Sequence, residues 1–432
     1  MNGIASVTAA SNTTPIVITA SATLKIADGE LKIDGVLGND TANGAFYVKS
    51  MDRSNTSFEL YADKALTKPV AGKGEYQSGG TIYSALKDDY AIVVGINRYP
   101  ALNALHGPEA DATAFFKWLV SPMGAMVAMS KARCILSSDY PNPDPSDEAT
   151  WQPALDALKL AFWKYAKLAF ENDKKTGSAR VGRRLWVFLA GHGITPSKAP
   201  SPDLDDAALL AASASVERYG EHLTGFSWIS WFKDAAAFDE IILFMDCCRD
   251  LKNNVPAIPC TLTPLLKDGR GDVRIFYAVA TDLDSQSFED KIGDEYHGFF
   301  SHALMQTLQN EALLDTQNRL TAPVVAQQLK KIVPQLRKDQ VPRFIPNPPP
   351  EITLVKGYLA LKPNLQVTFT PGLKGTVELF QGDNTLQSID SHDVNDGPWS
   401  LRVDPFKIYK LAIPGVKSEF VEMNAAVKNV NF

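Results

Sequence analysis

Hydrophobic and polar residues alternate over short distances at both ends of the chain, whereas the middle contains longer apolar runs. Residues 1–83 hold runs such as IVITA and AFYVKS, separated by NDTANG and AGKG, and residues 356–432 hold LQVTFT and WSLRVDPFKIYKLAI. Alternation broken by turn formers is typical of β-strands. We therefore expect a small all-β domain at each end. The C-terminal one should be sandwich-like and should follow a Pro-rich linker at 342–355.

The middle of the chain, residues 84–341, has the pattern of an α/β domain. Its apolar runs are nearly unbroken, which is typical of strands covered on both faces of a parallel sheet. We expect these strands at 90–96, 131–136, 184–190, 240–246 and 273–280. Apolar residues at helical spacing lie between them, at Ala112/Phe115/Phe116/Leu119, Leu155/Leu158/Phe162/Tyr165/Leu168 and Phe300/Ala303/Leu304/Leu308. The sequence therefore predicts a mainly parallel sheet flanked by helices, with a last helix that starts near Pro323 and bends at Pro334.

Composition narrows the class of protein. The chain has 432 residues, 45% hydrophobic and 21% charged, which suits several ordinary globular domains. The net charge is −6 and no block of Lys or Arg stands out, so we expect no nucleic-acid partner. No apolar run reaches membrane-spanning length, and the first residues do not resemble a signal peptide. We expect a cytoplasmic protein that binds a protein or peptide substrate, with a regulatory protein as a further potential partner, and that does not bind membranes.

Cysteine usage points to a reactive thiol. There are four cysteines, Cys134, Cys247, Cys248 and Cys260, which are too few for a disulfide scaffold. Cys247 and Cys248 are adjacent and so lack the C-x-x-C spacing of zinc and redox motifs. A nucleophilic cysteine in a reducing compartment is the remaining interpretation.

Two reactive residue types follow predicted strands. His192 lies in Gly191-His192-Gly193, after VFLA, and Cys248 lies in DCCRD, after IILFM. Loops at the carboxyl ends of parallel strands meet at one edge of the sheet. We therefore expect the imidazole and the thiol to lie close together.

This pair can hydrolyse a peptide bond without a metal or cofactor. An ordinary cysteine has a pKa near 8.5 and is a poor nucleophile at neutral pH, so it needs a base, and His192 can also protonate the leaving amine. The backbone N–H groups of Gly193 and Cys248 are candidate oxyanion donors. No G-x-S-x-G motif is present, which argues against a serine hydrolase.

At this point the chain resembles a known family. The segments AIVVGINRYP, LHGPEADATAFFKWL, VFLAGHG, FMDCCRD, AVATDLDSQSFED and HGFFSHALMQTL are similar, in order and spacing, to the caspases, metacaspases and bacterial caspase-like peptidases. The separation of 56 residues (248 − 192) between His192 and Cys248 is close to the caspase spacing of about fifty. In that family the nucleophile is the third residue of a D-x-C-type motif. The resemblance therefore implies a caspase-like fold with Cys248 as the nucleophile, and leaves Cys247 as a packing residue.

The resemblance also implies a substrate preference. Caspases that cleave after Asp carry an Arg where this chain has Leu105, and a Gln where it has Asp246. An acid in that pocket implies cleavage after Arg or Lys, as in metacaspases. Asp111 is a second candidate pocket acid, while Ser287 and Phe288 match the pair that lines the family's substrate groove. Two simpler interpretations stay open: Asp246 caps a turn, or Asp111 stabilises a helix N-terminus.

Further features follow from the relatives. Many metacaspases bind Ca²⁺, and Asp203, Asp205 and Asp206 are candidate ligands, although a solvated loop is the favoured interpretation of this segment. Residues 14–60 resemble β modules of phage tail fibres, which fits a prokaryotic origin. His106, His222, His297, His302 and His392 lack a comparable strand-end context and are expected to be structural.

Self-processing and loss of activity are the two remaining alternatives. The segment after the nucleophile carries Lys252, Lys267 and Arg270, so a peptidase specific for basic residues could cleave itself there. A scaffold that keeps the caspase-like fold and works through its β domains is the alternative function. Retention of both His192 and Cys248 argues against it.

Overall fold

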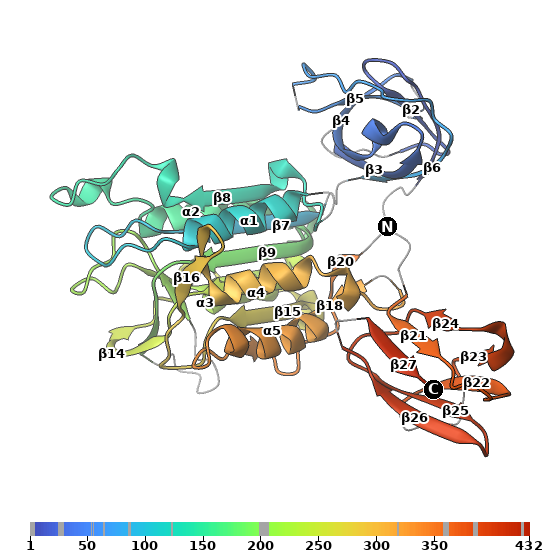
Figure 1. Ribbon diagram of the computed structural model, residues 1–432. Helices are drawn as coiled ribbons and strands as arrows, with labels where there is room; N and C mark the ends of the chain where they lie inside the picture. The colour runs from blue at the N-terminus through green and yellow to red at the C-terminus, as the bar shows by residue number, and fades with distance from the viewer. Residues whose placement is uncertain are drawn as a thin grey trace. The chain divides into compact units, whose positions relative to one another are not determined.

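The computed structural model describes residues 5–24, 30–52, 54, 56–63, 65–84, 88–121, 124–197, 207–317, 319–356, 363–382, 388–424 and 427–432 (Figure 1). The chain divides into two compact units. One contains Met1–Met305 and Leu329–Ile352, and the other contains Gln306–Gln328 and Thr353–Phe432.

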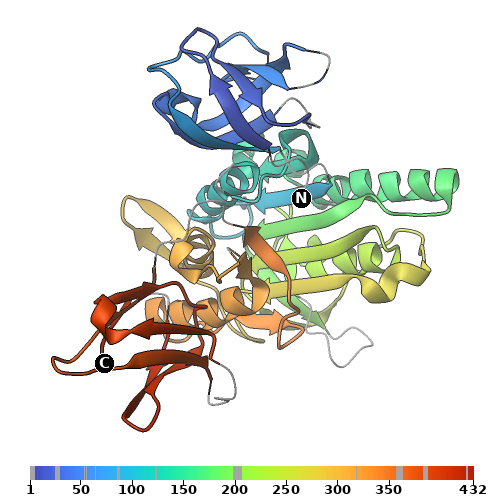
Figure 2. The same cartoon turned by 90° about the vertical axis from the view of Figure 1, so that its right-hand side faces the viewer.

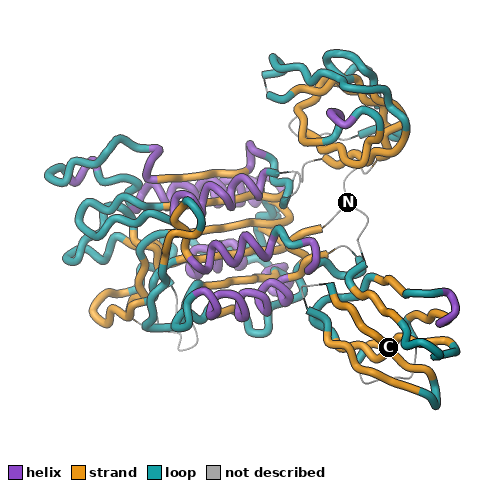
Figure 3. Tube along the Cα trace, viewed as in Figure 1, coloured by secondary structure: helices purple, strands orange, loops and turns teal. Residues whose placement is uncertain are grey.

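The N-terminal strands form a closed barrel in the order β1-β2-β5-β4-β3-β6 (Figures 1 and 3). The strands are β1 Ala5–Ala10, β2 Val17–Ala20, β3 Glu30–Leu37, β4 Gly44–Ser50, β5 Ser57–Tyr61 and β6 Ser78–Ser84. Alternate residues point inward, so Ile18, Phe58 and Leu60 are fully buried in the barrel interior. Closure leaves no unpaired edge strand, which protects this small domain from edge-to-edge association.

A six-stranded sheet forms the centre of the first unit. Its order is β19-β15-β13-β9-β7-β8, and every strand is parallel except the edge strand β19. The strands are β7 Asp89–Gly95, β8 Ala132–Leu136, β9 Gly182–Ala190, β13 Phe238–Asp246, β15 Arg274–Val279 and β19 Arg343–Ile345. The five parallel strands coincide with the five predicted apolar runs to within two residues at each end. The chain is thus of the mixed α/β class.

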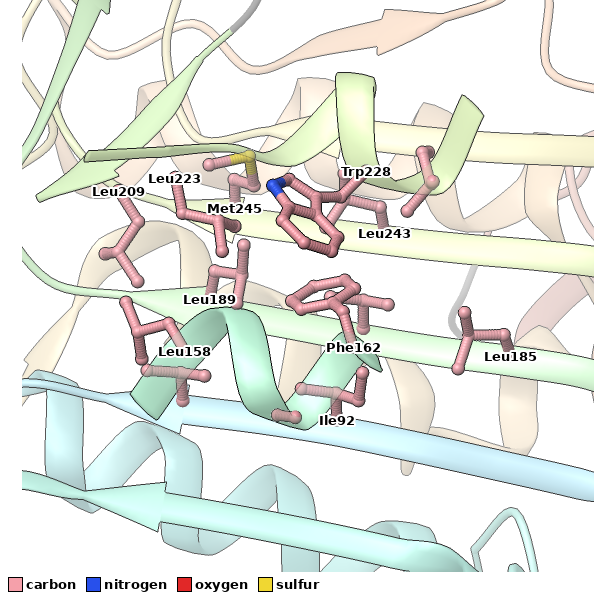
Figure 4. Close-up of a cluster of buried hydrophobic side chains, with 14 of the residues drawn as sticks. Ile92, Leu158, Phe162, Leu185, Leu189, Leu209, Leu223, Trp228, Leu243 and Met245 are labelled. Carbon is pink, nitrogen blue, oxygen red and sulfur yellow. The ribbon is translucent and has the colours of Figure 1, made fainter. Parts of the chain in front are cut away.

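Helices cover both faces of this sheet (Figures 1 and 2). They are α1 Pro108–Val120, α2 Leu155–Thr176, α3 Gly225–Asp234, α4 Phe299–Leu308 and α5 Ala322–Leu336. On one face Phe162 of α2 and Trp228 of α3 pack against sheet residues such as Leu243 (Figure 4). On the other face Phe115 of α1 stacks on Phe188 with ring centroids 4.7 Å apart. The predicted apolar stripes supply most of this packing, although Trp118 of α1 is buried as well and was not part of the predicted stripe.

Short strands extend two loops at the carboxyl edge of the sheet. One small sheet has the order β12-β11-β10-β14, with β10 Gly193–Ser197, β11 Ala208–Leu210, β12 His222–Thr224 and β14 Asp250–Pro256. A separate hairpin joins β16 Glu289–Ile292 to β17 Glu295–Gly298. These strands lie next to the predicted reactive residues, and the pattern of apolar residues did not predict them.

The second unit contains a β-sandwich. One sheet has the order β24-β21-β27 and the other β23-β22-β25-β26. The strands are β21 Leu365–Thr368, β22 Thr376–Gln381, β23 Asp390–Asp393, β24 Trp399–Leu401, β25 Ile408–Ile413, β26 Lys417–Glu422 and β27 Lys428–Asn431. Val367 and Trp399 of one sheet and Leu411 of the other belong to the same buried cluster. The two sheets therefore share one core.

The Pro-rich segment predicted as a linker, 342–355, contains ordered strand pairing. It includes β19, which pairs with β15, and most of β20 Thr353–Lys356, which pairs with β18 Arg319–Thr321. Proline is compatible with edge strands, where the missing N–H faces away from the ladder. Short 3-10 turns complete the described chain at Asp40–Ala42, Met129–Lys131, Ser137–Asp139, Glu148–Thr150, Asp268–Asp272, Glu311–Leu313 and Val394–Asp396.

Candidate active site

A cleft of about 360 Å³ lies at the carboxyl edge of the six-stranded sheet. His192 follows β9, Cys248 follows β13, and Ser287 follows β15; all three line the cleft. The segment after β7 contributes Asn103 and leads into α1, whose first turn carries Asp111. Four neighbouring parallel strands thus deliver side chains to one place, as expected for this type of sheet.

Strand pairing on both sides of His192 and Cys248 holds these residues in register. Asp246 pairs with Ala190 at the end of β13 and β9, an offset of 56 residues. Asp250 pairs with Ile194 in the parallel strands β14 and β10, which is again an offset of 56 residues. His192 and Cys248 have the same offset and lie midway between these pairs. Since paired strands are about 4.8 Å apart, the two backbones are held close to one another.

His192 is oriented by its neighbours on both sides of the ring. Its backbone N–H donates to the hydroxyl oxygen of Tyr99 at 2.9 Å, and the Tyr99 ring packs against the imidazole with centroids 4.7 Å apart. The Nε2 atom lies 2.7 Å from the carbonyl oxygen of Asn103. Because a carbonyl only accepts, Nε2 carries the proton in this arrangement. The Nδ1 atom of the neutral imidazole is then free to act as a base.

Cys248 rests as a protonated thiol. Its side chain is half-buried, and Sγ donates to the carbonyl oxygen of Ser287 at 3.4 Å. Burial raises the pKa of the thiol to about 11, and the nearby carboxylates of Asp250 and Asp246 act in the same direction. A thiolate is therefore not preformed, and a base must remove the proton during the reaction.

The neighbouring Cys247 points away into the core. It is 2% exposed and belongs to the large apolar cluster beneath the sheet edge. Gly193 packs directly over it, since a Cβ atom at Gly193 would lie 2.6 Å from the Cys247 sulfur and 2.7 Å from the Cys248 carbonyl oxygen. Only glycine allows this close approach, which brings the two candidate oxyanion donors, the N–H groups of Gly193 and Cys248, into one region.

Two of the carboxylates that line the cleft, Asp246 and Asp111, lie next to the same glycine. Asp246 accepts hydrogen bonds from the hydroxyl of Ser287 at 2.6 Å, and from the N–H and hydroxyl of Ser301 at 3.0 and 2.6 Å. Burial raises the pKa of Asp246 even so. A Cβ atom at Gly298 would lie 2.3 Å from an Asp246 oxygen and 3.4 Å from an Asp111 oxygen, so both acids border this glycine.

Asp111 is held by residues at the end of the β16–β17 hairpin. One oxygen lies 2.7 Å from Nδ1 of His297, and the other accepts the Gly298 N–H at 2.8 Å. Burial raises the pKa of Asp111 to about 6, and the negative charge of Asp246 contributes. The hydrogen bond to Asp111 raises the pKa of His297, a residue that was expected to be structural.

Several residues in the cleft or next to it were not predicted from the sequence. Glu289 accepts the backbone N–H groups of His106 and Gly107, and so ties the hairpin to the segment before α1. Tyr99 and Ser301 contact the predicted residues directly. Phe288 was predicted and lines the cleft, with its N–H donated to Gln340. Hydrogen-bonding side chains of this kind occur throughout any sequence, and no spacing rule singles them out.

The predicted calcium ligands Asp203, Asp205 and Asp206 lie outside the described residues. Within the described ranges, no group of three or more His, Cys, Asp or Glu side chains is arranged to hold a metal ion. Among the helices that the structure describes, none is both long and apolar enough to cross a membrane.

Comparisons with known proteins show a likeness to solved structures only. No protein-family model and no curated protein matches the sequence. Among solved structures, the chain is similar to caspase-1 from Spodoptera frugiperda, with 13% sequence identity and a TM-score of 0.36, over 60% of this chain and 85% of that one. Because the sequence identity and the TM-score are this low, a functional proposal must rest on the residues of the cleft.

Proposed function

We propose that this protein is a cysteine endopeptidase in which His192 and Cys248 form the catalytic dyad. The observation that carries the proposal is the shared register of the two residues, because strand pairing before and after them holds an imidazole and a thiol at one cleft. A histidine anchored at Nε2 and a half-buried, unbridged thiol are the parts that nucleophilic peptide hydrolysis requires.

The reaction proceeds in two halves. Nδ1 of His192 takes the Cys248 proton while the sulfur attacks the scissile carbonyl carbon, and the N–H groups of Gly193 and Cys248 stabilise the oxyanion. The imidazolium then donates its proton to the departing amine, which leaves a thioester on Cys248. Water, deprotonated by the same imidazole, attacks the thioester carbon. The C–S bond then breaks, the new carboxyl terminus is released, and the imidazolium returns its proton to the Cys248 sulfur.

The raised thiol pKa explains why substrate and base must act together. With a pKa of about 11, roughly one molecule in ten thousand carries the thiolate at pH 7. The low thiolate population does not limit the reaction if His192 takes the proton within the substrate complex. The sulfur then attacks the carbonyl as the Cys248 thiolate and the His192 imidazolium form. Tyr99 and the Asn103 carbonyl keep the ring in position for that transfer.

The carboxylates of Asp246 and Asp111 favour a basic residue before the scissile bond. Asp246 and Asp111 both line the cleft, and Asp246 lies two residues before the nucleophile. A carboxylate has about four acceptor positions, so the three hydrogen bonds that Asp246 accepts leave room for a guanidinium or ammonium. The proposed substrates are therefore proteins or peptides cleaved after Arg or Lys.

A panel of fluorogenic peptides tests the function. Substrates with Arg, Lys, Asp or Leu before the reporter are incubated with the full chain and with Cys248→Ala, over a range of calcium concentrations. We expect cleavage after Arg and Lys, absent in the variant. A wild-type chain that cleaves none of the peptides would support the scaffold alternative.

A further inference from the structure

Gln340 is a fully buried glutamine beside the cleft, outside the predicted site. It lies between α5 and β19, and its side chain contacts the segment after β15 at three points. Its Oε1 accepts the N–H of Phe288 at 3.1 Å, and its Nε2 donates to the carbonyl oxygen of Ala280 and to the hydroxyl of Ser287, each at 3.2 Å. One amide thus fixes both ends of the segment 280–288.

These contacts fix the direction of a chain of hydrogen bonds. The Phe288 N–H can only donate, so it selects the oxygen end of the Gln340 amide and leaves Nε2 to face Ser287. A hydroxyl that accepts from Nε2 has one proton left to donate. In Ser287 that proton points to Asp246, at 2.6 Å. The order Gln340, Ser287, Asp246 therefore holds the Asp246 carboxylate as an acceptor in one orientation.

The same segment also contacts the nucleophile. The carbonyl of Ser287 accepts the Cys248 thiol proton at 3.4 Å, and Ser287 and Phe288 both line the cleft. Removing Gln340 would leave the Phe288 N–H without its acceptor and the Ser287 hydroxyl without its donor. Both losses loosen the segment at the point where it covers the thiol.

We propose that Gln340 is a positioning residue that sets, through Ser287, both the orientation of the Asp246 carboxylate and the cover over the Cys248 thiol. The inference rests on the proposed peptidase function. It assigns Gln340 no contact with substrate, only control of two groups that make such contact.

The first measurement does not depend on peptidase activity. The rate at which iodoacetamide alkylates Cys248 is followed by mass spectrometry of the peptide that contains it. In Gln340→Leu, which keeps the bulk and removes the three hydrogen bonds, we expect alkylation at least threefold faster than in the wild type. In Gln340→Glu the new carboxylate competes with Asp246 for the Ser287 proton and cannot donate to Ala280, so we expect a change in the same direction.

The second measurement is the preference for a basic residue. The ratio of kcat/KM for Arg over norleucine before the reporter should fall roughly three- to tenfold in both variants, the size of one lost hydrogen bond. Gln328→Leu is the matched control, because Gln328 is 7% exposed and its Oε1 has no hydrogen-bond partner among the described residues. It should match the wild type in both measurements.

The outcomes test the positioning role of Gln340 and the peptidase function separately. A folded Gln340→Leu or Gln340→Glu protein with wild-type alkylation and wild-type preference overturns the inference, as does an equal change in Gln328→Leu. If Gln340→Leu does not fold by circular dichroism, Gln340→Glu decides. A wild-type chain that cleaves no peptide refutes the peptidase proposal instead. The alkylation rates then still test whether Gln340 controls the cover over the Cys248 thiol.

Discussion

The sharpest prediction concerns Asp246→Asn, which keeps the shape of the side chain and removes its charge. The asparagine oxygen can still accept the Ser301 N–H, because that donor cannot rotate away. The amide nitrogen then faces Ser287, whose hydroxyl can turn to accept from it. The fold should therefore tolerate the change, and the cleft loses one carboxylate.

The size of the effect follows from the setting of this carboxylate. A charge-assisted hydrogen bond from an arginine side chain to the acceptor position that stays open on Asp246 contributes about 1.5–3 kcal/mol, which is roughly a ten- to hundredfold preference over a neutral side chain. Burial raises the pKa of Asp246, so part of the attraction is used to ionise this carboxyl, and the preference is expected to weaken as the pH falls. An aspartate substrate would face a like charge and should be cleaved very poorly.

The assay compares kcat/KM for Arg, Lys, norleucine and Asp substrates in the wild type and in Asp246→Asn. The Arg preference should collapse in the variant, while Cys248 still reacts with iodoacetamide. Asp282→Asn is the control, since that carboxylate is exposed and pairs with Arg343. Preferred cleavage after Asp in the wild type, or an Arg preference that survives Asp246→Asn, would refute the reasoning.

Four further outcomes are expected. Cys248→Ala should abolish cleavage and Cys247→Ala should retain much of it; the reverse result would move the nucleophile by one residue. His192→Ala should lose activity without loss of helical signal in circular dichroism, and normal turnover in that variant would end the dyad model. The Arg preference should rise with pH through about 6 as Asp111 gains its charge, and should be flatter in Asp111→Asn; a preference that falls with pH would contradict this. Self-cleavage, seen by mass spectrometry as fragments absent from Cys248→Ala, should follow Arg270, which is exposed, whereas intact protein under activating conditions would exclude it.

The sheet was predictable because burial on both faces leaves a strong signal. The runs at 90–96 and 240–246 form β7 and β13, where most side chains must be apolar whatever their neighbours. The strands β10 and β14 leave no such signal. Gly193–Ser197 includes a glycine and a proline, and its pairing depends on Asp250–Pro256, far away in sequence. Long-range pairing of short polar segments cannot be found from local periodicity.

The sequence indicates which residues lie at the cleft better than it indicates how they contact one another. His192 and Cys248 follow strong strand patterns, so the sheet edge is enough to bring them together, and the structure places both in one cleft. The contact between Asp111 and His297 could not be predicted, because it joins α1 to the end of a hairpin that the pattern of apolar residues does not indicate. Gln340 likewise contacts Ser287 across 53 residues, through a fold that must be known first.

The matched pairing around His192 and Cys248 restricts which changes in chain length the protein can accept. The alignment of His192 with Cys248 depends on equal spacing along two short stretches, from Ala190 to Ile194 and from Asp246 to Asp250. Adding or removing one residue in either stretch would shift one reactive side chain relative to the other. The alignment itself does not depend on the number of residues between Ser197 and Phe238. That segment includes β11, which pairs with β10, and α3, which packs in the core, so only changes in length that leave these elements intact would preserve the alignment. The separation of 56 residues between His192 and Cys248 is therefore not itself required. The two four-residue intervals must stay equal in length for the two side chains to stay aligned.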